Sequence, residues 1–371
     1  MVKYYELGGS KCLNEIVVAG SHDAGITSGK SNVQTQGFNI FIQAGVGVRF
    51  FDLRIAAAAA GTPPGGVKRV ELKAIHAADK VFGVKNPLVR HEDKTRQLGA
   101  QGGVWDLKRT KLIAGAGDFG ASLDRMLQEA RDFVTSAAGN DEFLILKFDK
   151  CQNWEHIAER CNSVLQGALY TGGGNVNTMK LKDLRGKVVV LFSPDGANTA
   201  AQAGFDGPKS GILKFKNLYE GGAYEPEFNG LQYYGKGGTS IVKPFKKQSQ
   251  NVKKQGKLLE KAKALVSPQV MAMMYWTTTG LFESIKKRND KMWDPPNVQK
   301  MKQLWASGLA DMVESRNPLT LPQGSPLVGA TRKRFMPNIV MIDFADPEKC
   351  QTIRGLNDLS PHDLAGLGAD V

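Results

Sequence analysis

The chain has 371 residues, 42% of them hydrophobic, which is enough for one large barrel or sandwich or for two ordinary domains. No apolar run approaches the ~18 residues that a bilayer-spanning helix needs. The net charge of +13 favours anionic partners, namely phospholipid surfaces, nucleic acid or phosphorylated small molecules. The four cysteines are scattered without a CxxC pair, which argues against a zinc site and a disulfide framework.

The first residues, Met1-Val2-Lys3-Tyr4-Tyr5, lack the apolar core of a secretory signal. Three locations are compatible with this start: the cytoplasm, export by a route without a cleaved signal, or export after removal of a signal. In each of them we expect a protein that lies peripherally at membranes. The oligomeric state is left open.

Short apolar runs recur along the chain, with amphipathic stretches between them. Several runs are nearly continuous, which is typical of parallel strands buried on both faces. This alternation predicts one distorted (β/α)8 barrel of the TIM type. The predicted strands are 15–18, 48–53, 71–75, 143–148, 188–192, 270–276 and 339–344, and the predicted helices are 122–136, 154–166, 249–265 and 298–313.

Two regions interrupt the alternation. Residues 56–66 are an alanine run followed by Gly61-Thr62-Pro63-Pro64-Gly65-Gly66, which is typical of a mobile turn. Residues 197–238 are rich in glycine and polar side chains and predict long loops. The end of the chain is small and polar, so we assign 1–354 to one catalytic barrel and 355–371 to a C-terminal tail on the surface.

His22 lies in Ala19-Gly20-Ser21-His22-Asp23-Ala24-Gly25, directly after the first predicted strand. Its small neighbours leave room for a substrate, and an imidazole can move a proton near neutral pH. Further along, the apolar strand of Gly47-Val48-Arg49-Phe50-Phe51-Asp52-Leu53-Arg54 ends in an acid and a guanidinium on one face. Together these groups suggest an enzyme that acts on a phosphate ester.

His76 is predicted at the end of strand 71–75. In a (β/α) barrel the carboxyl ends of the strands meet at one rim, where active sites lie, so His22, Arg54 and His76 should share one cleft. That set suits cleavage of a phosphodiester by a neighbouring hydroxyl. One imidazole takes the attacking proton, the other protonates the leaving oxygen, and the guanidinium holds the phosphoryl oxygens.

The ordered set of motifs resembles the catalytic X domain of bacterial-type phosphatidylinositol-specific phospholipase C, in the superfamily of phospholipase C-like phosphodiesterases. The resemblance extends over nearly the whole chain. It rests on Gly20-Ser21-His22-Asp23, the segment 47–54, the strand-end His76, the helix and strand within 127–146, and the strands within 184–191 and 338–344.

The resemblance implies roles for the site residues. His22 would be the general base that removes the 2-hydroxyl proton of inositol, oriented by Asp343. His76 would be the general acid on the diacylglycerol oxygen, supported by Asp23. The first product would be a cyclic phosphodiester.

Metal dependence turns on Arg54, which the resemblance implies is a phosphate clamp positioned by Asp52. Calcium-dependent relatives carry an acid at that position, with metal ligands at the positions of Asp23, Asp52 and Asp149. A guanidinium there would repel a cation. We therefore expect no cofactor and disfavour calcium. Metal-free relatives carry a lysine where this chain has Asp149, which could pair with Arg54 or with Lys147 on the same strand face.

Substrate recognition departs from the family. Ser193 stands near the position of an arginine that contacts inositol in the relatives. Lys243, in Lys243-Pro244-Phe245, aligns loosely with an acid and would suit a more anionic headgroup. Trp276 could stack on a sugar ring or pack in the core. The candidate substrate-binding residues for a phosphoinositide-like substrate are Lys147, Asp149, Lys243 and Trp276.

Other residues have competing interpretations. His91 is a reserve candidate for the general acid, whereas His156 and His362 are expected to be structural or exposed. Trp293 is an interfacial anchor or a packed loop residue. The lysine-rich stretch 243–263 is either a solvated helix face or a surface that meets an anionic bilayer.

The sequence therefore predicts a metal-independent phospholipase C-like phosphodiesterase that acts at an anionic phospholipid membrane. The alternative is a non-catalytic or weakly catalytic module of the same fold that binds anionic phosphate headgroups. The set of two histidines, Arg54 and Asp343 favours the enzyme, because simple binding does not need two imidazoles and a buried acid. Nucleic acid is not an expected partner, because the chain shows no reader motif and no aromatic–basic interleaving.

Overall fold

Eight parallel strands close into a barrel in the order β1-β15-β14-β13-β12-β11-β10-β2. The computed structural model describes residues 1–59, 70–77, 80–81, 84–85, 92–98, 104–110, 117–206, 208–237, 248–265, 269–278, 284–304 and 337–358. The predicted (β/α)8 architecture is confirmed. The barrel strands are β1 (Val18–Ser21), β2 (Val48–Leu53), β10 (Phe143–Phe148), β11 (Lys187–Phe192), β12 (Ile212–Asn217), β13 (Gly230–Gly235), β14 (Met271–Tyr275) and β15 (Ile339–Ile342).

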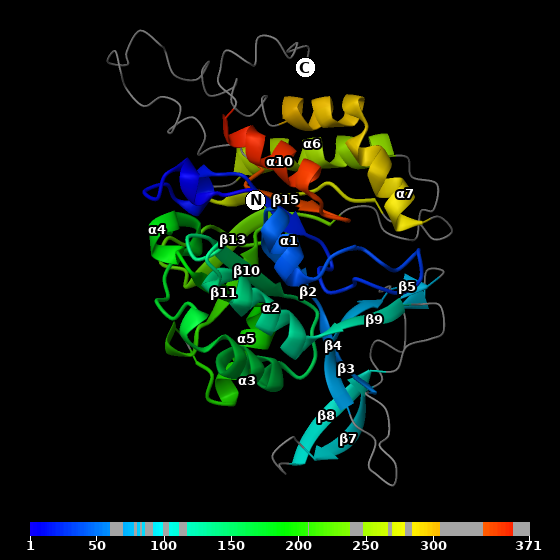
Figure 1. The fold of residues 1–371 in the computed structure, drawn as a ribbon, viewed down its shortest axis with the longest axis vertical. Coiled ribbons are helices and arrows are strands. Elements are labelled where there is room, and N and C mark those ends of the chain that lie inside the picture. Colours follow the sequence, from blue (N-terminus) through cyan, green and yellow to red (C-terminus); the bar gives the residue numbers. More distant parts are fainter. Residues whose placement is uncertain are drawn as a thin grey trace.

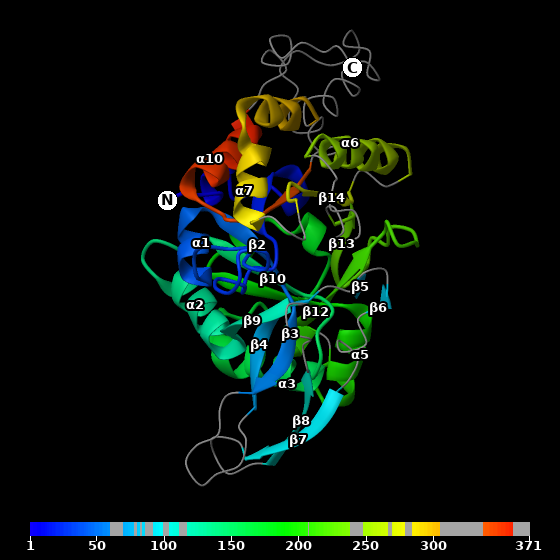
Figure 2. The same ribbon diagram turned by 90° about the vertical axis from the view of Figure 1, so that its right-hand side faces the viewer.

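Helices surround the barrel, with α6 and α10 on one side and α3 and α5 on the opposite side (Figures 1 and 2). The α-helices are α1 (Ile40–Val46), α2 (Leu123–Thr135), α3 (Trp154–Leu165), α4 (Leu181–Leu184), α5 (Pro194–Gln202), α6 (Gln248–Leu265), α7 (Ile285–Asp290) and α10 (Pro347–Gly355), and residues 295–304 are also helical. Within the described part of the chain, no helix combines the length and apolar character needed to cross a membrane.

Short 3-10 helices complete the connections. They are η1 (Tyr5–Leu7), η2 (Leu13–Glu15), η4 (Gln166–Ala168), η5 (Val176–Thr178), η6 (Pro208–Ser210), η7 (Lys291–Trp293) and η9 (Leu356–Asp358). Since η2 takes the start of the predicted strand 15–18, β1 begins later than expected. Beyond the predicted end of the barrel, η9 buries Leu356, and Asn357 donates a hydrogen bond to the Val17 carbonyl at 2.9 Å.

A second sheet, in the order β7-β8-β3-β4-β9, leaves the barrel after β2. Its strands are β3 (Ile55–Ala59), β4 (Val70–Ala77), β7 (Glu92–Leu98), β8 (Val104–Thr110) and β9 (Gly117–Ser122), and a separate two-stranded ribbon pairs β5 (Lys80–Val81) with β6 (Val84–Lys85). Both ribbon views show β3, β4, β7 and β8 extending away from the barrel (Figures 1 and 2).

The prediction that strand 71–75 belongs to the barrel is wrong. This segment lies in β4, which pairs antiparallel with β3. Only residues 60–69 join the two strands, and a parallel partner would need a crossover of a dozen or more residues. The alanine run predicted as a turn is in part strand as well, because Ala56–Ala59 belong to β3.

The prediction of long loops over 197–238 is also wrong, since this region contains the end of α5, η6, β12 and β13. Two of the glycines that suggested loops are strand residues, since Gly230 begins β13 and Gly235 ends it. At Gly230, which has a φ of +147°, a Cβ atom would lie 1.8 Å from the Lys214 carbonyl oxygen. Glycine therefore permits β13 to begin beside β12.

A buried ion pair between Arg49 of β2 and Glu142, which directly precedes β10, links the two neighbouring strands. The Arg49 Nε atom donates to Glu142 Oε2 at 2.8 Å, and neither side chain is exposed. The remaining guanidinium N–H groups donate to carbonyls of Ala44, Val48 and Val2, and Glu142 Oε1 accepts from the Tyr4 and Tyr5 amides. The pair thus joins the N-terminus, β2 and β10.

We expect Glu142→Ala to lower the free energy of unfolding by about 3–5 kcal/mol, because it leaves a buried guanidinium without its counter-charge. Urea denaturation measures this change. The control is Asp290→Ala, which breaks the exposed Lys286–Asp290 pair and should cost less than about 1 kcal/mol. Equal losses in the two variants would contradict the structural role of the Arg49–Glu142 pair.

Candidate active site

His22 and Asp343 follow neighbouring barrel strands. His22 comes directly after β1 and Asp343 directly after β15, and these strands pair in parallel with Ser21 opposite Ile342. The His22 Nδ1 atom therefore lies 3.0 Å from Asp343 Oδ1. The backbone amide of His22 also donates to the Ile342 carbonyl at 3.0 Å. The imidazole is thus held at the carboxyl end of the barrel, with its Nε2 atom directed away from Asp343.

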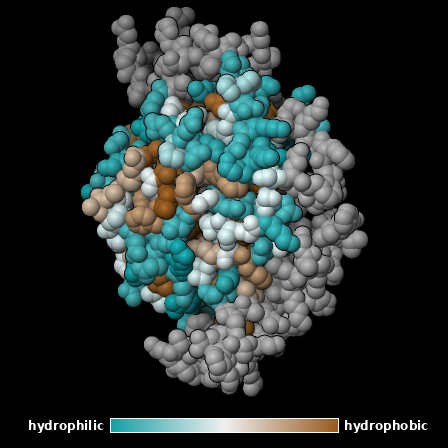
Figure 3. All heavy atoms as spheres, turned by 45° about the vertical axis from the view of Figure 1, so that its right-hand side comes forward, coloured by the Kyte–Doolittle hydropathy of each residue, from teal (hydrophilic) through white to brown (hydrophobic). Residues whose placement is uncertain are grey.

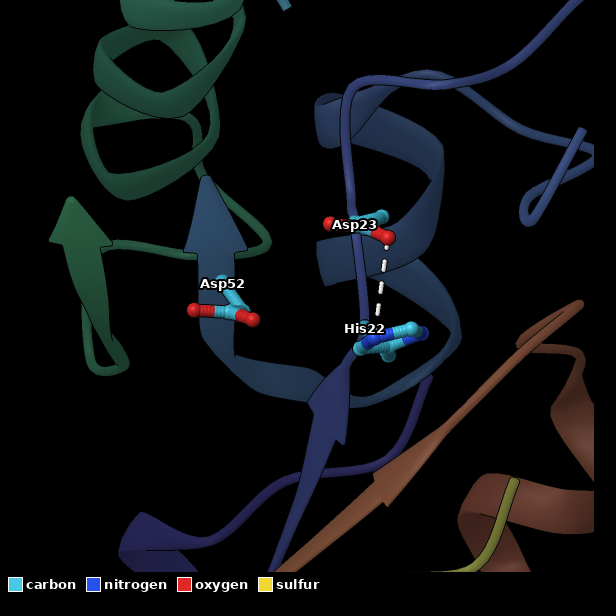
Figure 4. A group of neighbouring side chains, drawn as sticks. All are labelled: His22, Asp23 and Asp52. Atoms are coloured by element: carbon cyan, nitrogen blue, oxygen red, sulfur yellow. Dashed lines mark ion pairs between the residues drawn. The ribbon is translucent and has the colours of Figure 1, made fainter. Parts of the chain in front are cut away.

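Asp23 is the common partner of three cationic or protonatable side chains. Its Oδ2 atom lies 2.7 Å from His76 Nδ1 and 3.5 Å from His22 Nε2. Its Oδ1 atom lies 3.1 Å from Arg54 Nε. Figure 4 shows Asp23 beside His22 at the end of β1, with Asp52 on the neighbouring β2. The three residues predicted to share one cleft, His22, Arg54 and His76, are therefore brought together around this carboxylate.

The backbone at Asp23 is unusual, because its φ of 44° lies in the left-handed region. The turn is fixed from both sides: the Ala24 amide donates to the Asp52 carbonyl at 2.9 Å, and the Thr35 hydroxyl donates to the Asp23 carbonyl at 2.9 Å. This conformation aims the carboxylate at the histidines. Strain of this kind persists where the surroundings determine it, and it is concentrated at functional sites.

His76 reaches the site from the second sheet and not from the rim of the barrel. It lies on β4, where the amide of the preceding Ile75 donates to the Arg54 carbonyl at 2.9 Å. This bond ties β4 to the chain just beyond β2. His76 is therefore in the predicted place, but the predicted reason, a barrel strand that ends there, is wrong.

Lys147 forms a second charged cluster beside the first. It faces Asp52 across the parallel pair of β10 and β2, with 2.9 Å between Nζ and Oδ1, and its Nζ lies 3.1 Å from Asp149 Oδ2. Of the two partners predicted for Asp149, Arg54 and Lys147, the contact with Lys147 is observed. The Lys147 ammonium also lies 4.6 Å from the centre of the Phe215 ring. The Lys147 side chain is buried, with 1% of it exposed, whereas 32% of the Asp149 side chain is exposed.

Asp52 is predicted to position Arg54, and in the structure the Asp23 carboxylate contacts this guanidinium. Asp52 forms an ion pair with Lys147. The reason is register: Asp52 and Lys147 are direct neighbours on adjacent strands, while Arg54 has already left β2.

Charges around His22 control its protonation. Burial disfavours the imidazolium, but the carboxylates of Asp23 and Asp343 outweigh burial and raise the pKa of His22 to about 9. Burial raises the pKa of Asp343, although His22 opposes this shift. Burial also acts on Asp23, but Arg54 and the two histidines hold the pKa of its carboxyl well below the usual range. Asp23 therefore remains an anion between cationic groups at neutral pH.

Among the described residues, one group of side chains places its ligand atoms close enough together to hold a metal ion. Ligand atoms of His22, Asp23 and Asp52 lie within 4.8 Å of one another. The same carboxylates already contact the cationic side chains of Arg54 and Lys147. A divalent ion at this point would lie beside two fixed positive charges, so the donor set suits the cations that the chain itself provides.

Several residues that the sequence analysis considered for the site are not part of the cluster around Asp23. Trp276 is fully buried and its indole N–H donates to the Met292 carbonyl at 3.0 Å, so it packs in the core and does not offer a face to a sugar. Ser193 caps α5 by accepting from the Gly196 amide. His156 lies on α3 near Glu155 and Glu159 and is structural or exposed as expected. Lys243, His91 and His362 lie outside the described residues.

Tyr275, at the end of β14, is a site residue that the sequence interpretation missed. Its ring meets the His22 ring edge-on, with 6.0 Å between the ring centres. Asn251 donates to its carbonyl at 2.9 Å and Gln255 accepts from its amide at 3.2 Å. Alternation along β14 could have identified it, because Tyr275 and the buried Trp276 must point to opposite faces.

No protein-family model and no curated protein sequence matches the chain. Among solved structures, the phosphatidylinositol-specific phospholipase C from Listeria monocytogenes is similar over 95% of this chain and 96% of its own, at 14% identity and a TM-score of 0.47. A pentafluoro-phenylalanine-containing phosphatidylinositol-specific phospholipase C from Staphylococcus aureus is similar over 95% of each chain, at 15% identity and a TM-score of 0.46. The likeness is one of fold.

We expect His22 to titrate with a pKa of about 9 and Asp343→Asn to lower that pKa, because the variant removes a negative charge that stabilises the imidazolium and leaves burial, which favours the neutral ring. NMR titration of the histidine ring protons measures both values. Asp195→Asn, a change at an exposed acid of α5, is the control and should leave the His22 pKa unchanged. An unchanged pKa in Asp343→Asn would contradict the pairing.

Proposed function

We propose that this protein is a phosphodiesterase that cleaves the headgroup ester of a phospholipid, in the manner of a phosphatidylinositol-specific phospholipase C. The observation that carries the proposal is the convergence of two imidazoles and one guanidinium on the Asp23 carboxylate at the mouth of the barrel. This arrangement provides a base, an acid and an anion clamp within one cluster.

His22 is the proposed general base. Its Nδ1 atom is held by Asp343, and Nε2 of the neutral ring accepts the proton of an attacking hydroxyl. Because the pKa of His22 is about 9, this neutral form is the minor one at neutral pH. The imidazolium that forms is stabilised by two carboxylates, those of Asp343 and Asp23. This is the part that a buried acid plays behind a catalytic histidine in other hydrolytic sites.

His76 is the proposed general acid. Its Nδ1 atom is held by Asp23 at 2.7 Å, which leaves Nε2 to protonate the leaving oxygen. Arg54 has 21% of its side chain exposed, and its guanidinium is the proposed contact for the phosphoryl oxygens. A guanidinium placed there stabilises the negative charge that develops as phosphorus is attacked.

The proposed reaction uses a hydroxyl of the headgroup itself. The hydroxyl oxygen bonds to phosphorus while its proton passes to His22. The bond from phosphorus to the glycerol oxygen breaks, and that oxygen takes a proton from His76. The products are a cyclic phosphodiester and diacylglycerol, and no metal enters the scheme because Arg54 supplies the positive charge. A phosphoinositide-like headgroup, with a hydroxyl next to the phosphate, is the proposed substrate.

A membrane surface is the proposed location of the substrate. Phe38, Phe41 and Ile42 are exposed at 38%, 40% and 45%, at and before the first turn of α1. Because α1 connects β1 to β2, this turn lies toward the carboxyl ends of the strands, as the site does. Figure 3 shows apolar side chains gathered among hydrophilic ones on the face that carries α1. Such a patch suits insertion into a bilayer.

We expect the protein to release diacylglycerol and cyclic inositol phosphate from phosphatidylinositol vesicles, both detected by mass spectrometry. His22→Ala should lower the rate by about 10²–10⁴-fold, because it removes the general base. His156→Ala, a change on the outer helix α3, is the control and should retain the wild-type rate.

Equal rates for His22→Ala and wild type would contradict the mechanism. Vesicle binding without any product would instead support the alternative of a binding module for anionic phosphate headgroups. The assay is run with EDTA, and the account predicts full activity in it. Activity that EDTA abolishes and calcium restores would contradict a metal-free site.

A further inference from the structure

A groove lined with lysines lies between α6 and the ends of β12 and β13. It has a volume of about 390 Å³, and none of the lining residues is acidic. Figure 2 shows α6 beside β13 and β14. We define this lysine groove by its lining residues, which are Tyr219, Lys236, Gln250, Lys253, Lys254, Lys257, Leu258 and Lys261.

The lysines on α6 are crowded. Lys253, Lys257 and Lys261 follow one another at intervals of four residues, and all three are exposed. Like charges at this spacing lie on one face of a helix and destabilise it. A bound polyanion would remove that repulsion, so the spacing favours an anionic occupant.

Two further lysines are held in place by neutral groups. Lys236 donates to the Tyr219 hydroxyl at 2.7 Å and lies 4.4 Å from the centre of the same ring. Lys254 donates to the Gly237 carbonyl. The contact with Tyr219 orients the Lys236 ammonium group without neutralising its charge. The groove therefore presents a concentrated positive charge.

Apolar side chains pack beneath the groove lysines. Leu258 packs with Leu218 and Tyr234 in a small apolar cluster of its own. On its buried face, α6 contacts the end of β14 through Asn251, which donates to the carbonyls of Tyr275 and Thr277. The helix that carries the groove lysines therefore contacts the same end of β14 where the Tyr275 ring meets His22.

The groove is at the same end of the barrel as the candidate active site. Lys236 directly follows β13, and Tyr219 lies in the connection that leaves β12. The strands of the barrel are parallel, so these positions share a rim with His22 and Asp343. An anionic surface that faces the mouth would also face the lysine groove.

We propose that the lysine groove binds the headgroup phosphates of anionic phospholipids that are not cleaved, and thereby holds the mouth of the barrel at the membrane. The charge of the groove selects this occupant, and the exposed apolar turn of α1 at the same end supports a membrane. The orientation of the mouth rests on the proposed function, whereas the binding of anionic lipid does not.

The test is sedimentation of the full chain with vesicles of phosphatidylcholine that contain phosphatidylglycerol. The variant Lys253→Gln/Lys257→Gln/Lys261→Gln keeps good helix formers and removes three charges. It should bind about 100-fold more weakly, since each of the three lysines near an anionic surface contributes about 1 kcal/mol and every ~1.4 kcal/mol is tenfold in affinity. The matched control, Lys180→Gln/Lys182→Gln/Lys209→Gln, removes three exposed charges before β11 and β12, at the opposite end of the barrel.

Two outcomes overturn the proposal: equal loss of vesicle binding in the two variants, and wild-type binding in the groove variant. A second assay uses a soluble short-chain phosphatidylinositol. The groove variant should cleave it at the wild-type rate, because the site is intact. If the wild-type protein cleaves nothing but the groove variant alone loses vesicle binding, the proposed catalysis fails and the lysine groove stands.

Discussion

The Asp23 carboxylate is the interaction on which the rest of the site depends. One oxygen lies between His76 and His22, and the other contacts Arg54. These three side chains come from the end of β1, from the chain beyond β2 and from β4, so one anion joins the barrel to the second sheet. Three positive or protonatable groups would repel one another without it. The left-handed turn at Asp23, with a φ of 44°, is the conformational cost of this placement.

A second charged cluster lies beside the one centred on Asp23. Asp52, Lys147 and Asp149 form the second cluster, in which two carboxylates outweigh the effect of burial and hold the pKa of Lys147 well above its usual value. This lysine stays charged beneath the mouth and takes up the carboxylate of Asp52. Arg54 contacts the other carboxylate, that of Asp23. The proposed metal-free chemistry rests on this arrangement, in which Arg54 and Lys147 already contact the carboxylates of Asp23 and Asp52.

Much of the barrel could be predicted from sequence because its strands are buried on both faces and therefore read as continuous apolar runs, as in 143–148 and 188–192. The pairing of His22 with Asp343 was implied by the family resemblance, and it forms because β1 and β15 are neighbouring parallel strands that end at the same rim. The origin of His76 could not be predicted, since an apolar run does not reveal whether its partner is parallel or antiparallel. The β12–β13 region was hidden because close approach of two backbones requires glycine, which resembles a loop in sequence.

The most direct test of the shared carboxylate is the rate of phosphatidylinositol cleavage by Asp23→Asn. Asparagine tolerates the left-handed backbone and keeps the shape of the side chain, so the fold should be retained, as near-ultraviolet circular dichroism can verify. Without the charge, His76 and Arg54 lose their common anion. The account predicts a rate lower by at least about 100-fold with an intact fold. A folded variant that cleaves at the wild-type rate would contradict it.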